Sequence, residues 1–390
     1  MKIANFYLMV ILPFIFWTAR YLINPIFPLY LINIGATKFQ IGIIIAIPSL
    51  ICIFTRVLFG FALSKYGGWK IIFYALLAQI ISFFLYFLIN NPLLLYLVAI
   101  IDGLSYSSFG PTGMELSIRF SRINEKNEVI GKYLTSIGFG MVLGPLLCSI
   151  LTSYFTYNKL FLISAFFTIF GLLFLFFATK ENYFSRKDMI NDSINYKNID
   201  ILSSLKNIIK NKNLMLLYIS TLLFAMCQGV YNTLFSIHSK NNIGLNDSII
   251  AFLFTINGLS NALIRIPSGK IISKFSKKKI ILIGMVLISL MFFIISITNN
   301  ILLLLLAMVM HGIGWGMRAV ATTSMVSEST PEVLRGIALN IFWNMFDIGA
   351  MIGAMFGGSL ASFLYMNYIF SICCIIILIG IILVILVKEK

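Results

Sequence analysis

Charged residues are scarce in this chain. Only 11% of its 390 residues are Asp, Glu, Lys or Arg, and 60% are hydrophobic, whereas soluble domains carry about 25% charged residues. A soluble domain could not bury this much apolar surface. Uncharged apolar runs of about 18 to 20 residues, long enough to cross roughly 30 Å of hydrocarbon as helix, cover 71–89, 160–178, 280–297 and 369–387. The composition therefore predicts a membrane protein.

Residues for metal binding and catalysis are also few. The chain has two His and five Cys, and the Cys fall inside apolar runs without metal-ligand spacing or a disulfide framework. No nucleophile, base and orienting residue form a set, and no Gly-x-x-x-x-Gly-Lys-Ser/Thr loop for ATP is present. We predict no enzyme, no catalytic residues, no cofactor and no metal, so that energy must come from gradients or a partner.

The positions of Lys and Arg orient the chain. Twelve spans are predicted at 6–31, 41–63, 70–89, 93–115, 132–155, 160–178, 214–238, 248–270, 279–298, 301–324, 336–360 and 367–387. One set of loops holds nearly all the basic residues, and such loops face the cytoplasm. The chain is then a multi-pass protein of the cell membrane with both termini in the cytoplasm. The net charge of +16 is explained by this topology, so nucleic acid is not expected as a partner.

The longest connection, 179–213, is polar and divides the spans six and six. It predicts an N-terminal six-helix bundle over 1–178, a cytoplasmic linker over 179–213 and a C-terminal six-helix bundle over 214–390.

The two halves repeat each other at an offset of 209 residues. Arg56 matches Arg265, and Gly103 matches Gly312. The same offset superimposes Asn33-Ile34-Gly35 on Asn242-Ile243-Gly244, Gly60 on Gly269, Ser64-Lys65 on Ser273-Lys274 and Asn90-Asn91 on Asn299-Asn300. Because six spans return the chain to its starting side, the halves run in the same direction. The fold class expected is an all-α membrane protein built from two parallel six-helix repeats, with substrate bound between them near mid-membrane.

The stretch from Gly60 to Lys70, copied from Gly269 to Lys279, resembles the loop signature of the major facilitator superfamily, which runs Gly-x-x-x-Asp-basic-x-Gly-x-basic-basic. The resemblance covers essentially the whole chain. It implies a secondary transporter that works by rocking of its halves, with Gly60, Lys65, Gly269 and Lys274 as gating residues. The Asp of the signature is Ser64 here and Ser273 in the copy, which weakens the charged latch typical of the family.

Span five reads Gly131-x8-Gly140-x3-Gly144-Pro145, similar to the motif of the family's exporters except that Cys148-Ser149 replaces its final glycine pair. Small residues at this spacing also let two helices approach closely, as Gly349, Gly353 and Gly357 do in span eleven. Both interpretations, export and tight packing, stay open. The exporters' Arg-x-x-Gln-Gly motif of span four is not reproduced, so proton antiport is implied by the family alone.

Polar residues inside the spans are the candidate substrate site, because such residues are costly in lipid and usually face a cavity or a partner. In the family, spans one, four, seven and ten line the central cavity, and these spans carry most of the polar faces here. The candidates are Arg20, Asn24, Asp102, Tyr106, Gln228, Tyr231, His311, Trp315, Arg318, Asn344 and Asp347.

Helix rise places Arg20 and Asp102 at nearly the same depth in the membrane. It also places Asp347 at the depth of His311, and the long side chain of Arg318 could compete with His311 for Asp347. We therefore expect one mixed-charge pair in each half. His311 as a packing residue and Asp347 as a residue that positions span eleven are the alternatives.

The function expected is a transporter that exports a small organic solute. The alternatives are a proton- or gradient-coupled importer of a sugar or other metabolite, and a receptor or scaffold that does not transport. The expected partners are a small-molecule substrate, the lipid bilayer and protons as a candidate coupling ion. The chain is expected to be a monomer.

Overall fold

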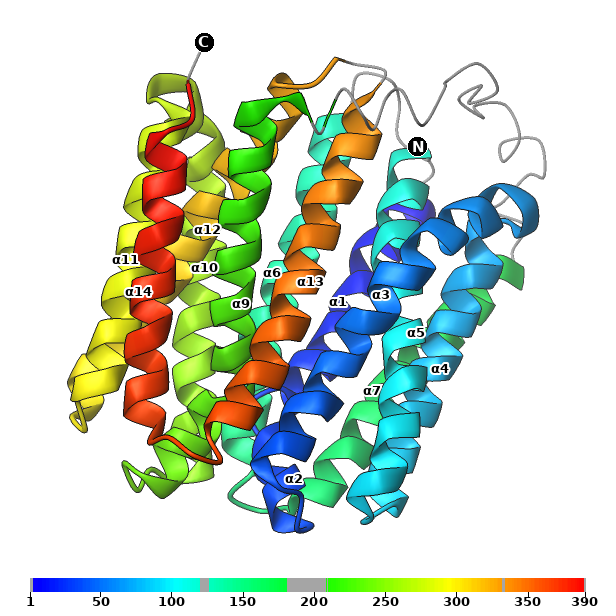
Figure 1. Ribbon diagram of the computed structural model, residues 1–390. Helices are drawn as coiled ribbons and strands as arrows, with labels where there is room; N and C mark the ends of the chain where they lie inside the picture. Colours follow the sequence, from blue (N-terminus) through cyan, green and yellow to red (C-terminus); the bar gives the residue numbers. More distant parts are fainter. Residues whose placement is uncertain (1–2, 120–125, 181–207, 209, 332–333, 389–390) are drawn as a thin grey trace. The chain divides into compact units, whose positions relative to one another are not determined.

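The computed structural model in Figure 1 describes residues 3–119, 126–180, 208, 210–331 and 334–388, and every secondary-structure element in these ranges is helical. The helices of the first half are α1 (Ile3–Ile23), α2 (Phe27–Asn33), α3 (Lys38–Tyr66), α4 (Gly68–Leu88), α5 (Pro92–Arg119), α6 (Lys126–Leu151) and α7 (Tyr157–Lys180). Those of the second half are α9 (Lys212–Asn241), α10 (Asp247–Lys274), α11 (Lys277–Ile297), α12 (Ile301–Glu328), α13 (Arg335–Leu360) and α14 (Met366–Ile385).

Eleven of the described helices are long and apolar enough to cross a membrane, and α1 with α2 forms a twelfth, broken span. The sequence predicted one continuous helix over 6–31. The structure instead bends by 42° between Val10–Ile23 and Phe27–Asn33. Pro25 and Pro28 explain the break, because proline has no backbone N–H and its ring excludes the preceding turn of helix.

The chain forms two compact units of six spans each, apart from two exchanged segments. Unit 1 contains 1–36, 47–196 and 246–255, and unit 2 contains 37–46, 197–245 and 256–390. Residues 38–46, the start of α3, thus belong to unit 2, where Lys38 Nζ donates to Ala361 O at 2.8 Å. The first residues of α10 belong to unit 1, where Ser248 Oγ donates to Ser149 O at 2.6 Å. Most of the predicted linker 179–213 lies outside the described residues.

The internal repeat predicted from sequence is present in the packing of the helices. In unit 1 the helices in contact are α1 with α5, α6 and α7, α4 with α5 and α7, and α5 with α6. Unit 2 has the corresponding six pairs, which are α9 with α12, α13 and α14, α11 with α12 and α14, and α12 with α13. Gly35 and Gly244, which the offset of 209 superimposes, have φ angles of 85° and 81°. This left-handed backbone favours glycine and ends the first span of each half with the same turn.

The glycine patterns of spans five and eleven are used for packing against the first helix of their own half. A Cβ atom on Gly144 of α6 would lie 2.7 Å from the Leu22 backbone nitrogen of α1. On Gly353 of α13, 209 residues later, it would collide with the backbone of Met226 on α9. The tight-packing interpretation is therefore confirmed for both patterns. Gly131 has open space around it and does not share this role.

Candidate functional site

Arg20 on α1 and Asp102 on α5 form a bidentate ion pair. Arg20 Nη1 donates to Asp102 Oδ1 at 2.6 Å and Nη2 donates to Oδ2 at 3.0 Å. The two side chains are 19% and 11% exposed, so the pair is largely buried in the middle of two predicted spans. Two parallel bonds match the planar guanidinium to the planar carboxylate. The pair predicted from helix depth is confirmed.

Aromatic rings surround this pair in unit 1. The Arg20 guanidinium lies 4.7 Å from the centroid of the Tyr106 ring, and Trp17 packs edge-on to Tyr106 at 5.7 Å. Cation–π contact adds to the stabilisation of a desolvated arginine. Asn24 lies in the break between α1 and α2, one turn beyond Arg20, and is partly buried. Unit 1 thus holds a charged, aromatic cluster that is mostly buried.

His311 on α12 is the centre of the corresponding cluster in unit 2. Its Nε2 bonds to Gln228 Oε1 of α9 at 2.9 Å, and its Nδ1 bonds to Asn257 Nδ2 of α10. His311 is 0% exposed, and the two amides are 3% and 5% exposed. Three helices therefore meet at one buried imidazole that is held from both sides by uncharged groups.

Tyr231 and Trp315 complete this cluster. The Tyr231 ring lies 4.9 Å from the His311 ring, and its hydroxyl points to Met308 Sδ at 3.4 Å. The Trp315 ring, one turn along α12, lies 5.9 Å from His311. Of the predicted C-terminal candidates, Gln228, Tyr231, His311 and Trp315 therefore come together in space.

Arg318 is buried two turns beyond His311 on α12, with 2% of its surface exposed. Its Nη2 donates to Thr221 Oγ1 at 2.9 Å, and its guanidinium lies 4.1 Å from the Phe224 ring centroid. In the described part of the chain, the hydrogen bond of Arg318 thus goes to a hydroxyl and not to a carboxylate. The ring face compensates part of the cost of desolvating the charge.

The predicted pairing of Asp347 with His311 is wrong, because both ring nitrogens of His311 are taken by amides. Arg318 is likewise directed to Thr221 and Phe224. Asp347 is buried on α13 with 2% exposure, and Asn344 lies one turn earlier on the same helix, partly exposed. These two candidates are not part of the His311 cluster. The side chains of the proposed gating residues Gly60, Lys65, Gly269 and Lys274 lie outside the described part of the structure.

The repeat relates the two clusters, with a shift of one residue between α1 and α9. His311 is the repeat partner of Asp102, and it bonds to Gln228, which directly precedes Gly229, the repeat partner of Arg20. Phe16 and Phe109 stack at 3.8 Å in unit 1. In unit 2, Arg318 is the repeat partner of Phe109 and lies over Phe224, which directly precedes the repeat partner of Phe16. The same scaffold therefore holds fixed charges in unit 1 and a neutral amide–imidazole network in unit 2.

The residues that sequence reasoning missed are Asn257, Thr221 and Phe224. Asn257 and Asn261 are one turn apart on α10, and Asn261 Nδ2 donates to Gly312 O at 3.2 Å. Two amides at this spacing in an apolar span are a usable signal of a polar helix contact. Thr221 and Phe224 carry no such signal, because a hydroxyl and a ring are common in any span.

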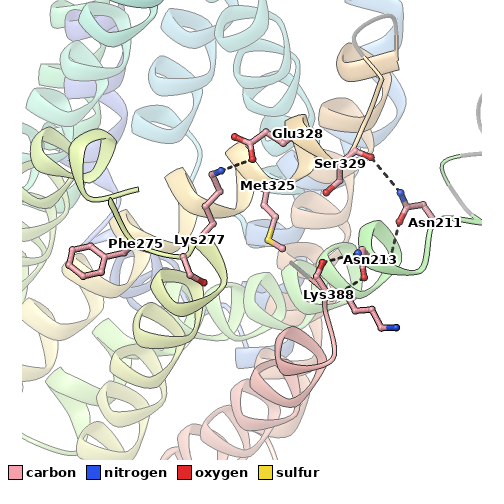
Figure 2. Close-up of a pocket in the computed structure, with 9 residues that line it drawn as sticks. Asn211, Asn213, Phe275, Lys277, Met325, Glu328, Ser329 and Lys388 are labelled. Atoms are coloured by element: carbon pink, nitrogen blue, oxygen red, sulfur yellow. Dashed lines mark hydrogen bonds and ion pairs between the residues drawn. The ribbon is translucent and has the colours of Figure 1, made fainter. Parts of the chain in front are cut away.

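A cavity of about 370 Å³ lies at one end of unit 2, where α9 and α11 begin and α12 ends. Lys277 Nζ donates to Glu328 Oε2 at 2.5 Å, and the Asn213 side chain bonds to the backbone of Lys388 at 3.0 and 3.1 Å. Figure 2 shows these side chains around the cavity. Asn211, the residue that caps α9, also contacts Ser329. These contacts fasten the end of α14 to the start of α9. In the part of the chain that the structure describes, no three His, Cys, Asp or Glu come together to hold a metal.

The model of the Major Facilitator Superfamily matches residues 9–219 and again 217–390, which is nearly the whole chain and repeats once per half. The chain belongs to the major facilitator superfamily. Transport of small molecules across a lipid bilayer is the function of this family, so the chain is a multi-pass membrane transporter. The resemblance and the fold class predicted from the sequence are confirmed.

Relatives and solved structures agree with this assignment. An uncharacterized MFS-type transporter of Methanocaldococcus jannaschii is 23% identical over 343 residues, 88% of this chain and 87% of the relative. Multidrug resistance protein 2 of Bacillus subtilis is 20% identical over 370 residues, 95% of this chain and 91% of the relative. The structure of the nucleoside transporter NupG matches with a TM-score of 0.79 at 15% identity, over 100% of both chains. A peptide transporter, POT, matches with a TM-score of 0.78 at 12% identity, over 98% and 93%.

Proposed function

We propose that this chain is a secondary active transporter that exports a small organic solute across the cytoplasmic membrane by alternating access. The bidentate Arg20–Asp102 pair carries the proposal. A structural scaffold does not need opposite charges in the middle of its spans, where they are expensive, whereas a partly exposed pair beside aromatic rings can be opened by a solute. Tyr106 and Trp17 offer that solute an apolar face.

Two observations favour export over the alternative of gradient-coupled import. The Gly140 and Gly144 spacing on α6 resembles the exporters' motif, and the contacts of these glycines with α1 would hold the helix that carries Arg20. Multidrug resistance protein 2 is among the relatives. We further propose a monomer built from bundles 1–178 and 214–390 joined by the linker 179–213. Both termini are proposed to be cytoplasmic, because nearly all the basic loop residues fall in one set of loops.

The proposal is tested with membrane vesicles of both orientations that contain the chain. Ethidium, uridine and alanyl-alanine serve as probes, chosen to cover the multidrug, nucleoside and peptide classes named for the similar proteins. Export predicts that at least one probe accumulates in inside-out vesicles under an imposed gradient and does not accumulate in right-side-out vesicles. Accumulation only in right-side-out vesicles would support import. Movement of no probe in either orientation, together with no thermal shift of the purified chain on addition of the probes, would favour the receptor or scaffold alternative.

A further inference from the structure

The Arg20–Asp102 ion pair is more than the packing of its helices requires. The repeat partners of Arg20 and Asp102 in unit 2 are Gly229 and His311, neither of which carries a fixed charge. Nevertheless α9 packs against α12 in unit 2 as α1 packs against α5 in unit 1. Contact between these helices therefore does not depend on an ion pair. Opposite charges inside two spans are costly, and they mark a site that does more than packing.

The pair is accessible at one side and has aromatic rings beside it. The Arg20 and Asp102 side chains keep 19% and 11% of their surface exposed, and Tyr21 and Tyr106 are also partly exposed. Trp17 contacts both tyrosine rings, with 5.7 Å between centroids in each case. A ligand that reaches the two charges therefore meets an apolar, aromatic surface next to them.

Tyr86 on α4 adds a buried hydroxyl to these surroundings. The residue is 2% exposed, and its hydroxyl has no hydrogen-bond partner among the residues that the structure describes. The charges of Asp102 and Arg20 both act on this hydroxyl. A buried hydroxyl without a partner costs free energy, and a polar group of a ligand bound beside the pair would recover it.

Charge balance decides which ligands can open the pair. A cation that binds Asp102 leaves Arg20 without its carboxylate, and an anion that binds Arg20 leaves Asp102 without its guanidinium. Either exchange strands a charge in a site that water reaches poorly, which is strongly unfavourable. A ligand with both an ammonium and a carboxylate strands neither charge. Its carboxylate accepts from the Arg20 guanidinium, and its ammonium donates to the Asp102 carboxylate.

We infer that the ligand of Arg20 and Asp102 is a zwitterion with an apolar side chain, of the kind found in α-amino acids and dipeptides. The inference rests on the proposed function, because it names the class of solute that is exported. Arg20 and Asp102 are then the residues that determine specificity, and Tyr21 and Tyr106 contact the apolar side chain. An organic cation such as ethidium and a neutral nucleoside such as uridine are not ligands of this pair.

Equilibrium binding to the purified full chain at neutral pH, measured by isothermal titration calorimetry, tests the inference. L-Phenylalanine is compared with phenethylamine, which lacks the carboxylate, and with 3-phenylpropionate, which lacks the ammonium. Phenylalanine should bind at least about tenfold more tightly than either analogue, because each analogue strands one charge. Equal binding of phenylalanine and either analogue would overturn the inference. Failure of both phenylalanine and alanyl-alanine to bind at millimolar concentrations would also overturn it.

Two variants should change the preference in opposite directions. Asp102→Asn keeps the charge of Arg20, so 3-phenylpropionate should bind more tightly than phenethylamine. Arg20→Gln keeps the charge of Asp102, so phenethylamine should bind more tightly than 3-phenylpropionate. General damage to the fold would weaken both analogues and could not produce this reversal.

Glu328→Gln is the control variant, because it removes the Lys277–Glu328 ion pair in unit 2 and should keep the wild-type preference for phenylalanine. The same order of affinities for the two analogues in Asp102→Asn and Arg20→Gln would overturn the inference. Should either variant fail to fold, the comparison of the three compounds on the wild-type chain still decides.

The vesicle assay separates this inference from the proposed function. Movement of ethidium or uridine by a chain that binds neither phenylalanine nor alanyl-alanine would overturn the inference and leave the transporter assignment intact. Tight binding of phenylalanine over both analogues, without movement of phenylalanine or alanyl-alanine in vesicles of either orientation, would contradict the proposed export. It would support the inferred class of ligand, since the binding measurement needs no transport.

Discussion

Arg20 and Asp102, on helices α1 and α5, are joined by two nearly parallel hydrogen bonds of 2.6 and 3.0 Å. Because both partners are largely buried, removal of either one leaves a charge without its partner in a site that water reaches poorly. The pair therefore gives a clear expectation for single and double variants.

Arg20→Ala and Asp102→Ala should each lower the free energy of unfolding by about 2 kcal/mol, since each strands a partly buried charge. The double variant should lose less than the sum of the two, because it leaves no orphaned charge. Thermal unfolding of the purified variants in one detergent measures this double-mutant cycle. Strict additivity would mean that the two side chains do not interact in the folded protein.

The glycine contacts predict where an added methyl group is tolerated. Gly144→Ala and Gly353→Ala should each destabilise the chain by about 1 to 3 kcal/mol, because the new Cβ would collide with the backbone of α1 or α9. Gly131→Ala on α6 and Gly336→Ala on α13 are the controls, since both positions have open space. The readout is the amount of folded, monodisperse protein and its unfolding temperature. A Gly353→Ala variant as stable as Gly336→Ala would contradict the close approach of α13 to α9.

Arg318 and Thr221 offer a second coupled pair. Thr221→Val should cost about 1 to 3 kcal/mol in the wild-type chain, because the buried guanidinium loses its hydroxyl acceptor. The same change should have little effect in an Arg318→Met background, where that donor is absent. Arg318→Met itself should be close to neutral or stabilising, as replacement of a buried charge by an apolar side chain often is. Equal costs for Thr221→Val in both backgrounds would show that the bond contributes nothing to stability.

The orientation in the membrane can be tested on a single helix. Lys212 and Asn242 lie at opposite ends of α9, and both are exposed. The basic loops predict that an impermeant maleimide labels Asn242→Cys from outside intact cells and labels Lys212→Cys only after the membrane is opened. Both variants are made in a chain whose five native cysteines are replaced by Ser or Ala. The reverse pattern would place the termini outside.

The number of spans, the repeat and the Arg20–Asp102 pair could be predicted because each depends on distance along the chain. Apolar run length fixes a span, and helix rise fixes the depth of a side chain. The direction in which a side chain points around the helix axis is not fixed in this way. Asp347 matches His311 in depth, yet His311 turns toward α9 and α10, where Gln228 and Asn257 satisfy it. A prediction from depth could not include Asn257, because it required knowledge of which face of α10 meets α12.

The break at Asn24–Ile26 had a sequence signal that hydropathy outweighed. Pro25 and Pro28 lie inside an apolar run of normal length, and proline is tolerated in many spans, as Pro13, Pro48 and Pro111 are in α1, α3 and α5. Two prolines three residues apart remove two backbone donors from neighbouring turns, which a single helix cannot absorb. The spacing of the pair, rather than the presence of proline, was the informative feature.

The role of the Arg20–Asp102 pair is tested most directly by transport with purified chain in proteoliposomes, with Asp102→Asn as the matched variant of nearly identical shape. Uptake of ethidium, uridine and alanyl-alanine is followed under an imposed pH gradient, and folded protein in each preparation is quantified by size-exclusion chromatography. The wild-type chain should move at least one probe. Asp102→Asn, folded in at least half the wild-type amount, should move that probe at least tenfold more slowly. Equal transport rates for the two proteins would contradict a role for the Arg20–Asp102 pair in transport.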